Sequence, residues 1–213
     1  MITLKFISLG FLCLGIFFLM QIILPLVSFQ IWEIGINSEG TTLVSPQNFG
    51  RSNVLGVSIQ NDDDFSYFVS NVERKNIPNY LEFTISIPKL KIEKKEVFVD
   101  SNDITSGLAH LPASALPGEK GNVFISGHSA INFFKGIKNA PFANLQDLKK
   151  GDQIEIFAGG AEFLYEVVEL RVVKPSDLSV INPPESLGRY ITLMTCVPPG
   201  LNLKRLVVVG KLI

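Results

Sequence analysis

The sequence predicts an all-β domain, folded as a closed barrel of seven or eight strands with one or two short helices, that follows an N-terminal membrane-spanning helix. Three observations lead to this prediction: a long uncharged stretch near the N-terminus, short β-rich segments from residue 81 onward, and turn-forming residues between those segments. Seven or eight strands suit a closed barrel or a sandwich, and the barrel is favoured.

The N-terminal stretch is long enough to span a bilayer. Between Lys5 and Glu33 lie 27 residues without a charge, and at about 1.5 Å per residue they exceed the roughly 30 Å hydrocarbon core. A cleaved secretory signal has a shorter apolar run of about 7 to 15 residues and a small-x-small cleavage site, which the sequence "LPLVSFQIWE" does not offer. Residues 1–33 are therefore expected to remain as an uncleaved transmembrane anchor in the lipid bilayer.

Charges on either side of the anchor predict its orientation. Lys5 and the amino terminus precede the span, whereas Glu33 and Glu39 follow it. The positive-inside tendency then keeps the N-terminus in the cytoplasm and puts the rest of the chain outside. The expected location is the cell membrane, with a single pass and an extracytoplasmic domain.

The chain after the anchor separates into a tether and a folded domain. Residues 34–80 include "GINSEGTTLVSPQNFGRSN", which is rich in Gly, Ser, Thr, Asn and Pro, as expected of a flexible linker and the entry to a domain. Residues 81–213 form the β-domain, with one short helix expected around "PFANLQDLKK". The expected strands, in chain order, are "LEFTISIP", "VFVD", "NVFIS", "DQIEIF", "FLYEVVELRVV", "YITLMTC" and "RLVVVGKLI".

Composition and charge argue against one large class of partners. With 46 % hydrophobic residues the chain is too apolar for intrinsic disorder. Its formal net charge of -1 provides no basic stripe that would release counterions from a polynucleotide. No nucleic-acid partner is therefore expected.

The two cysteines predict a free thiol in the β-domain. Cys13 lies inside the expected anchor and Cys196 in "TLMTCVPPG", so a disulfide between them would pull one residue out of the membrane. An unpaired thiol outside the cytoplasm is prone to oxidation, so such a cysteine is either buried and inert or kept for its reactivity. Cys196 alone does not decide between these two interpretations.

Histidine and arginine supply possible partners for this thiol. The chain has two histidines: His128 follows the strand "NVFIS", where Gly127 frees the backbone to present the imidazole at a rim, and His110 is interpreted as a structural or surface residue. If "YITLMTC" and "RLVVVGK" are antiparallel neighbours, the short connection between them sets Cys196 and Arg205 across from each other. A thiol and a guanidinium would then share one end of the sheet.

These residues resemble a known family. "TLMTC", followed nine residues later by Arg205, is similar to the TLxTC…R signature of sortases, the membrane-anchored cysteine transpeptidases of bacterial cell surfaces. The resemblance covers residues 83–213 and keeps the order His, Cys, Arg. It extends to "ISIPKLKI", "LPGEKGNVFISGHS", "FANLQDLKKGDQIEI" and "VVKPSDLSVINPP".

The resemblance implies an eight-stranded barrel that cleaves an LPxTG-like C-terminal sorting signal of surface proteins between Thr and Gly. Cys196 would attack the Thr carbonyl to form a thioester, and an amine from a cell-wall precursor or a protein lysine would resolve it. His128 suits proton exchange with the departing and incoming amines, and Arg205, always charged, suits donation to the oxyanion. No metal or organic cofactor is expected. The resemblance also implies that Ser129, Met194 and Thr195, which flank the catalytic residues, lie near the substrate groove; packing inside the barrel is the alternative for each of them.

Details of the sequence favour one subclass and leave alternatives. The "VPPGLNLK" connection and the "TCxPP" sequence look like class E or class D sortases. A pilin-polymerising sortase is the alternative, although "DDDFSYF" lacks the proline of the Asp-Pro-aromatic lid motif and the chain stops just past its last strand. A catalytically inactive membrane-tethered β-domain is a second alternative, disfavoured because all three residues are present. Two other families of cysteine enzymes fit less well. L,D-transpeptidases place a histidine two residues before the cysteine, where this chain has Met194. In papain-like enzymes the cysteine comes before the histidine in the sequence, which is the reverse of the order here.

Overall fold

The computed structural model describes residues 2–39, 56–62, 65–74, 77–105, 107–130 and 139–213. The chain divides into two compact units, residues 1–39 and 40–213, each of which is described by itself. The predicted tether includes residues 40–55, which lie outside the described residues.

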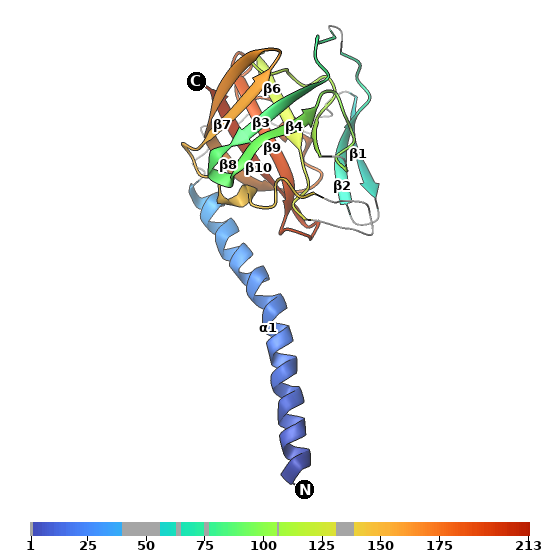
Figure 1. The fold of residues 1–213 in the computed structure, drawn as a ribbon, viewed down its shortest axis with the longest axis vertical. Helices are drawn as coiled ribbons and strands as arrows, with labels where there is room; N and C mark the ends of the chain where they lie inside the picture. Colours follow the sequence, from blue (N-terminus) through green and yellow to red (C-terminus); the bar gives the residue numbers. More distant parts are fainter. Residues whose placement is uncertain (1, 40–55, 63–64, 75–76, 106, 131–138) are drawn as a thin grey trace. The chain divides into compact units, whose positions relative to one another are not determined.

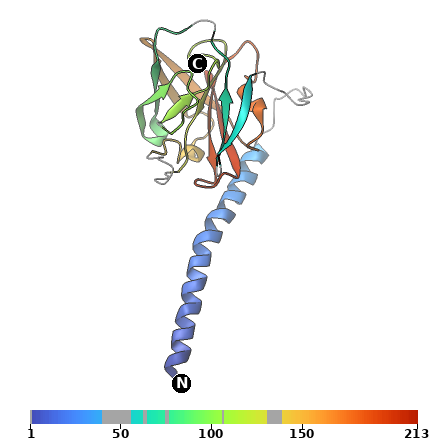
Figure 2. The ribbon, with the colours of Figure 1, turned by 90° about the vertical axis from the view of Figure 1, so that its right-hand side faces the viewer.

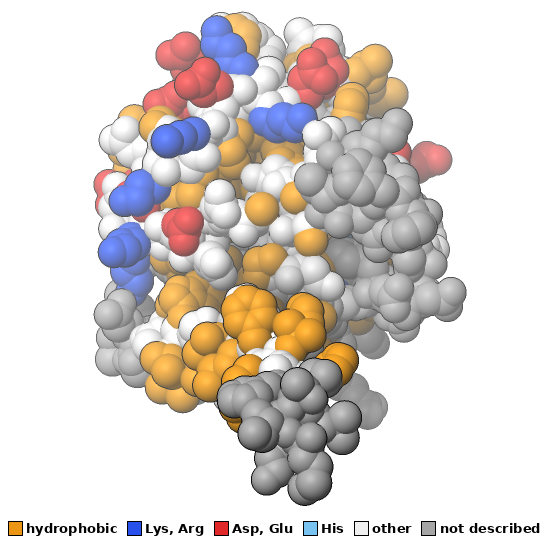
Figure 3. Space-filling view, turned by 60° about the horizontal axis from the view of Figure 1, so that its bottom comes forward, with side chains coloured by type: hydrophobic (Ala, Val, Ile, Leu, Met, Phe, Trp, Pro, Cys, Tyr) orange, Lys and Arg blue, Asp and Glu red, His pale blue; other side chains and the backbone are white. Residues whose placement is uncertain are grey.

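The first unit is one long apolar helix, α1 (Ile2–Glu39). Within it, Leu9–Ile36 has a mean hydropathy of 2.4 over its most apolar window and is long enough to cross a membrane. These 28 residues extend about 42 Å, more than the roughly 30 Å hydrocarbon core. Figure 3 shows hydrophobic side chains along the visible part of this helix. The helix continues past residue 33, the predicted end of the anchor.

The second unit is a closed barrel of eight strands, as predicted (Figure 1). The order around the barrel is β10-β8-β7-β3-β4-β5-β6-β9. Two of the contacts, β4 with β5 and β6 with β9, are parallel, and the others are antiparallel. The strands are β3 (Glu82–Ile87), β4 (Ile92–Phe98), β5 (Leu108–His110), β6 (Gly121–Ser126), β7 (Gln153–Ala158), β8 (Ala161–Val173), β9 (Arg189–Val197) and β10 (Lys204–Leu212).

Strand periodicity explains which faces are covered. In β7 the buried residues alternate with exposed ones, because one face lines the barrel and the other meets solvent. In β9, by contrast, every residue after the first is buried, and in β10 the consecutive residues 205–210 are buried, so both faces of these strands are covered there. The inner face fills the barrel. The outer face must therefore be covered by another part of the chain.

A two-stranded hairpin covers this outer face. It consists of β1 (Val57–Asp62) and β2 (Phe65–Ser70), which pair antiparallel. Phe68 packs on Phe124 of β6, with ring centroids 5.9 Å apart, in a cluster that continues to Met194 of β9. Figure 2 shows the hairpin in front of the red strands of the C-terminal part. The sequence analysis assigned this stretch to the linker and domain entry and did not predict the hairpin.

Polar contacts tie the end of the hairpin to the barrel. The backbone N–H of Ser70 donates to Asn102 Oδ1, and Asn102 Nδ2 donates to Ser70 O, both at 3.1 Å. Just beyond, the Arg74 guanidinium binds both carboxylate oxygens of Asp100, at 2.9 and 3.0 Å. This two-point contact is the favourable geometry for an arginine and a carboxylate. It fixes where the chain enters the barrel.

Short 3₁₀ helices fill the connections of the barrel. Those among the described residues are η1 (Pro88–Leu90), η3 (Leu145–Asp147) and η4 (Leu178–Ile181). η3 lies inside the segment predicted to form a short helix, but it is only one turn long. η4 packs its buried Val180 on the same outer cluster as the hairpin.

Candidate active site

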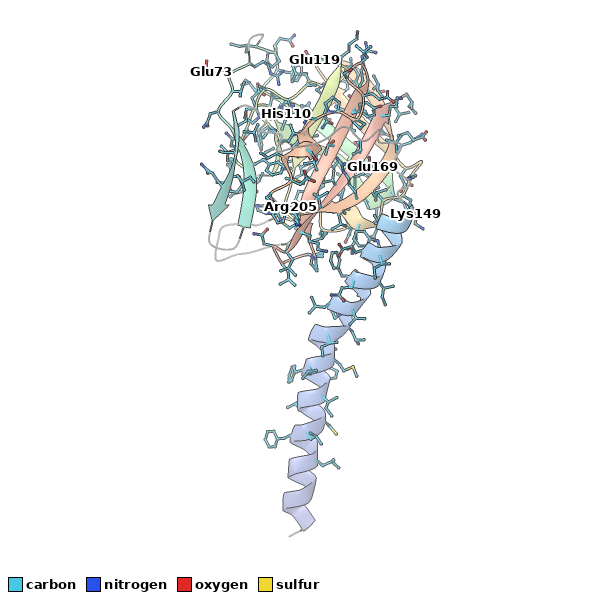
Figure 4. The ribbon with its side chains drawn as sticks, turned by 180° about the vertical axis from the view of Figure 1, so that it is seen from behind. Glu73, His110, Glu119, Lys149, Glu169 and Arg205 are labelled. Atoms are coloured by element: carbon cyan, nitrogen blue, oxygen red, sulfur yellow. The ribbon has the colours of Figure 1, made fainter. Side chains whose placement is uncertain are left out.

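The β9–β10 hairpin brings the thiol and the guanidinium together. The antiparallel register pairs Cys196 directly with Arg205, as predicted from the short connection. Residues opposite each other in an antiparallel pair point to the same face, with Cβ atoms about 4.5 to 5.5 Å apart. The six residues 198–203 connect the two strands. Figure 4 shows Arg205 near the lower end of the barrel.

His128 belongs to the segment that follows β6, the strand on the other side of β9. β6 runs parallel to β9, with Ser126 opposite Met194, and the pairing continues through Gly127, whose N–H donates to Met194 O at 3.1 Å. Counted one residue further along both chains, His128 corresponds to Cys196, but β6 itself ends at Ser126. The thiol therefore has Arg205 opposite it on β10, and the segment that carries His128 follows β6, the strand on the other side of β9.

All three side chains are withdrawn from water, which changes their proton affinities. Burial raises the pKa of the Cys196 thiol to about 11, against the opposing effect of the Arg205 charge. Burial lowers the pKa of His128 from its ordinary value, opposed by the Asp103 carboxylate. Burial also lowers the pKa of Arg205, opposed by the thiol. At neutral pH the resting site therefore holds a neutral thiol beside a neutral imidazole.

Arg205 is the most deeply buried of the three, with 1 % of its surface exposed. Its Nη1 donates to the carbonyl of Lys204 at 3.0 Å. A guanidinium keeps its proton in proteins, so it is a fixed donor with a planar, preorganised geometry. Such a group can stabilise negative charge that develops on a reacting oxygen.

The thiol has one close contact that the sequence analysis missed. Cys196 Sγ lies 3.9 Å from Oδ1 of Asn202, in the loop between β9 and β10. An amide oxygen accepts from S–H, so this contact favours the protonated thiol. In the sequence, Asn202 is only an amide side chain six residues after the cysteine. It indicates a contact with the thiol only when the β9–β10 loop is known to bring it back toward Cys196.

The three residues predicted to bind substrate are all buried around this centre. Ser129, 5 % exposed, follows His128 directly, and Met194, 3 % exposed, belongs to the apolar cluster beneath the hairpin. Thr195 is also 3 % exposed, and its hydroxyl donates to Gly127 O at 2.8 Å. Their role in substrate binding stays a prediction.

His110, the other histidine, is a structural residue. It is fully buried in β5. Its Nδ1 accepts from the Asp100 N–H at 3.3 Å, and its Nε2 lies 2.9 Å from Ala115 O and 2.8 Å from Ser114 Oγ. These contacts hold the ring in place inside the barrel. Figure 4 shows it in a different part of the barrel from Arg205.

Metal ligands do not gather in the described part of the chain. Within it, no group of three or more His, Cys, Asp or Glu side chains is arranged to hold a metal ion. The expectation of chemistry without a cofactor stays a prediction.

Comparison with known proteins gives the family. A sortase-domain family model matches residues 85–213, more than half of the chain. Sortase D of Bacillus subtilis (strain 168) is 31 % identical over 131 residues, which are 60 % of this chain and 61 % of that protein. The match therefore spans less than two thirds of the length of this curated relative.

Solved structures agree with this match. A lid mutant of sortase A from Corynebacterium diphtheriae has a TM-score of 0.56 and 31 % identity, covering 65 % of this chain and 73 % of that chain. Clostridium perfringens sortase C with the C-terminal cell wall sorting motif has a TM-score of 0.54 and 26 % identity, covering 61 % and 69 %. These relatives are named sortase D, A and C, so the class E or D assignment stays a prediction. The family model, which matches nearly the whole barrel, and these likenesses show that the chain belongs to the sortase family.

Proposed function

We propose that this sortase is a membrane-anchored cysteine transpeptidase that cleaves an LPxTG-like sorting signal between Thr and Gly and transfers the acyl group to an amine. The observation that supports the proposal is the β9–β10 register, which pairs Cys196 with Arg205; His128, on the segment that follows the neighbouring strand β6, is proposed as the third member of the site. The comparison with Clostridium perfringens sortase C adds support, because that structure is described with the C-terminal cell wall sorting motif.

In the first half-reaction His128 acts as a base and then as an acid. The neutral imidazole takes the thiol proton, and the Cys196 thiolate attacks the Thr carbonyl carbon. The carbonyl oxygen gains negative charge, and the Arg205 guanidinium donates to it. The Thr–Gly bond then breaks, and imidazolium protonates the leaving Gly amine. A thioester on Cys196 remains.

In the second half-reaction the same groups carry out the proton transfers in the opposite direction. An incoming amine attacks the thioester carbonyl, His128 takes a proton from that amine, and Arg205 again donates to the oxyanion. The carbon–sulfur bond breaks and an amide forms. The thiolate finally recovers its proton from His128, which restores the neutral resting pair that burial favours.

The apolar helix α1 is proposed to hold the enzyme in the cell membrane, with the N-terminus in the cytoplasm and the catalytic domain outside. Lys5 before the span and Glu33 after it favour this orientation. The anchor is expected to stay attached. Intact mass of protein purified from membranes tests this, and a chain that begins near residue 30 would contradict it.

The proposed reaction is tested on the full-length protein in detergent micelles. A library of LPxTG-like peptides is incubated with an N-terminal glycine peptide or a lysine derivative, and the products are identified by mass spectrometry. We expect a new amide and a transient acyl group on Cys196. Cys196→Ala should abolish both, whereas Cys13→Ser, which removes the other thiol, should leave both intact. Turnover that survives Cys196→Ala would refute the proposal.

A further inference from the structure

The chain that carries His128 is held closely by its neighbours. The N–H of Gly127 donates to Met194 O, and the carbonyl of His128 accepts from Phe142 N, both at 3.1 Å. A Cβ added to Gly127 would lie 2.5 Å from a Leu108 methyl and 2.8 Å from the Phe142 ring. The backbone just before the imidazole therefore has almost no room to shift.

A third contact comes from a side chain. Thr195 Oγ1 donates to the carbonyl oxygen of Gly127 at 2.8 Å, and both residues are buried. That oxygen belongs to the peptide unit whose nitrogen is the nitrogen of His128. Because a peptide unit is planar, a hydrogen bond to its oxygen also restrains the direction in which the next residue starts.

The position of Thr195 in β9 gives this bond a second meaning. Thr195 directly precedes the proposed nucleophile, Cys196, in β9. Its hydroxyl binds the carbonyl of Gly127, the residue directly before His128. The bond thus joins the strand that carries the thiol to the segment that carries the base. The bond from Gly127 N–H to Met194 O would remain after its loss, so what is released is the orientation of the peptide unit that leads into His128.

We propose that Thr195 is a positioning residue that keeps His128 within reach of Cys196 through the Gly127 carbonyl. This inference rests on the proposed function. Thr195 itself exchanges no proton with the substrate. A displacement of a reacting group by about 1 Å costs on the order of 100-fold in rate, so a bond of this kind controls kcat more than substrate affinity.

The test replaces the hydroxyl by a methyl group of the same shape. Thr195→Val removes the donor, so the Gly127 carbonyl oxygen loses this hydrogen bond. A matched control is available on the same strand. Thr192 is also buried, and its hydroxyl donates to Asn122 Oδ1 at 2.9 Å. Thr192→Val therefore removes an equivalent buried hydrogen bond without touching the backbone that leads to His128.

Two readouts separate positioning from general stability. In full-length protein with peptide and amine, Thr195→Val should lower kcat by about 10- to 100-fold, with KM within about threefold. The chain has only His110 and His128, so NMR of the histidine ring carbons follows each imidazole during a pH titration. In Thr195→Val the pKa of His128 should rise toward its ordinary value as the ring gains solvent, whereas Thr192→Val should leave both kcat and this titration near wild type.

Each outcome decides the inference. Thr195→Ser keeps the hydroxyl and should retain kcat within about threefold of wild type, a result that does not depend on whether Thr195→Val folds. The inference is overturned if Thr195→Ser loses as much activity as Thr195→Val, or if Thr195→Val behaves like Thr192→Val in both readouts. Activity that survives Cys196→Ala or His128→Ala would instead overturn the proposed function, so the two failures are distinguishable.

Discussion

Arg205 should control how readily Cys196 loses its proton. The two residues are directly opposite in the β9–β10 register, and both are almost fully buried. For an assumed charge separation of about 5 Å and an effective dielectric constant of about 20, the attraction is about 3 kcal/mol, which corresponds to a change of roughly 100-fold in the fraction of thiolate. Arg205→Gln removes this attraction, so the pKa of the thiol should rise above its wild-type value.

Alkylation by iodoacetamide measures this effect, because only the thiolate reacts. A Cys13→Ser background leaves Cys196 as the one thiol in the chain. With a wild-type pKa of about 11, about 1 % of the thiol is ionised at pH 9, and Arg205→Gln should slow alkylation by about 100-fold. A rate within about threefold of wild type would refute the reasoning.

A nearby arginine provides the control. Arg171 of β8 lies opposite Val207, two residues further along β10, is 31 % exposed and pairs with Glu169 at 3.9 Å. Its charge is farther from the thiol and better screened, so Arg171→Gln should alkylate at nearly the wild-type rate. Equal slowing by both substitutions would show that the effect is not specific to the Cys196–Arg205 pair.

Arg205→Lys separates the charge from the planar donor. A lysine keeps the positive charge, so alkylation should stay near wild type, but it loses the fixed guanidinium geometry. Loss of an oxyanion donor costs about 2.7 to 4 kcal/mol, or about 100- to 1,000-fold in kcat, and Arg205→Lys should recover only part of this. Full recovery of kcat would mean that Arg205 acts through its field alone.

Three further predictions follow from the same centre. Burial lowers the pKa of His128 and raises that of Cys196 to about 11. The value of kcat/KM should therefore fall as the pH drops below about 6.5 and as it rises to near 11. A fall that begins above pH 7 on the acid side would contradict the assignment. Asn202→Asp puts a carboxylate beside the thiol, so alkylation of Cys196 at pH 9 should slow, and acceleration would refute the contact. His110→Ala should lower the free energy of unfolding by about 1 to 3 kcal/mol, because it leaves buried partners unsatisfied, yet keep the pH profile of kcat/KM; a changed profile would give His110 a role in catalysis.

The sequence allowed much of the barrel and the centre of the site to be predicted. Alternating apolar residues and frequent turn signals identified the strands, and the short connection after Cys196 predicted its register with Arg205. These features could be predicted because the spacing of apolar residues is a property of a single strand, and the loop length is a property of a single hairpin. His128 was singled out because a glycine follows an apolar strand, and its role in catalysis stays a prediction.

Other features depend on contacts between distant residues. Thr195 and Gly127 are 68 positions apart, so nothing near either residue indicates that they are bonded. The β1–β2 hairpin was missed for a similar reason, since it is apolar on the side that packs on Phe124 and polar elsewhere, inside a stretch with the composition of a linker. Tertiary packing, rather than local preference, makes this stretch part of the folded domain.

The hairpin also decides where this protein can be cut. The match to the sortase-domain family begins at residue 85. A soluble fragment designed from this match alone would start just before β3. Such a fragment would expose Phe124, Met194 and Val207 on the outside of the barrel, a contiguous apolar strip now covered by Phe68 and its neighbours. Exposed strips of this kind promote self-association. A fragment that begins ahead of Val57 keeps the strip covered, so the smallest well-behaved piece of this enzyme is longer than its recognisable domain.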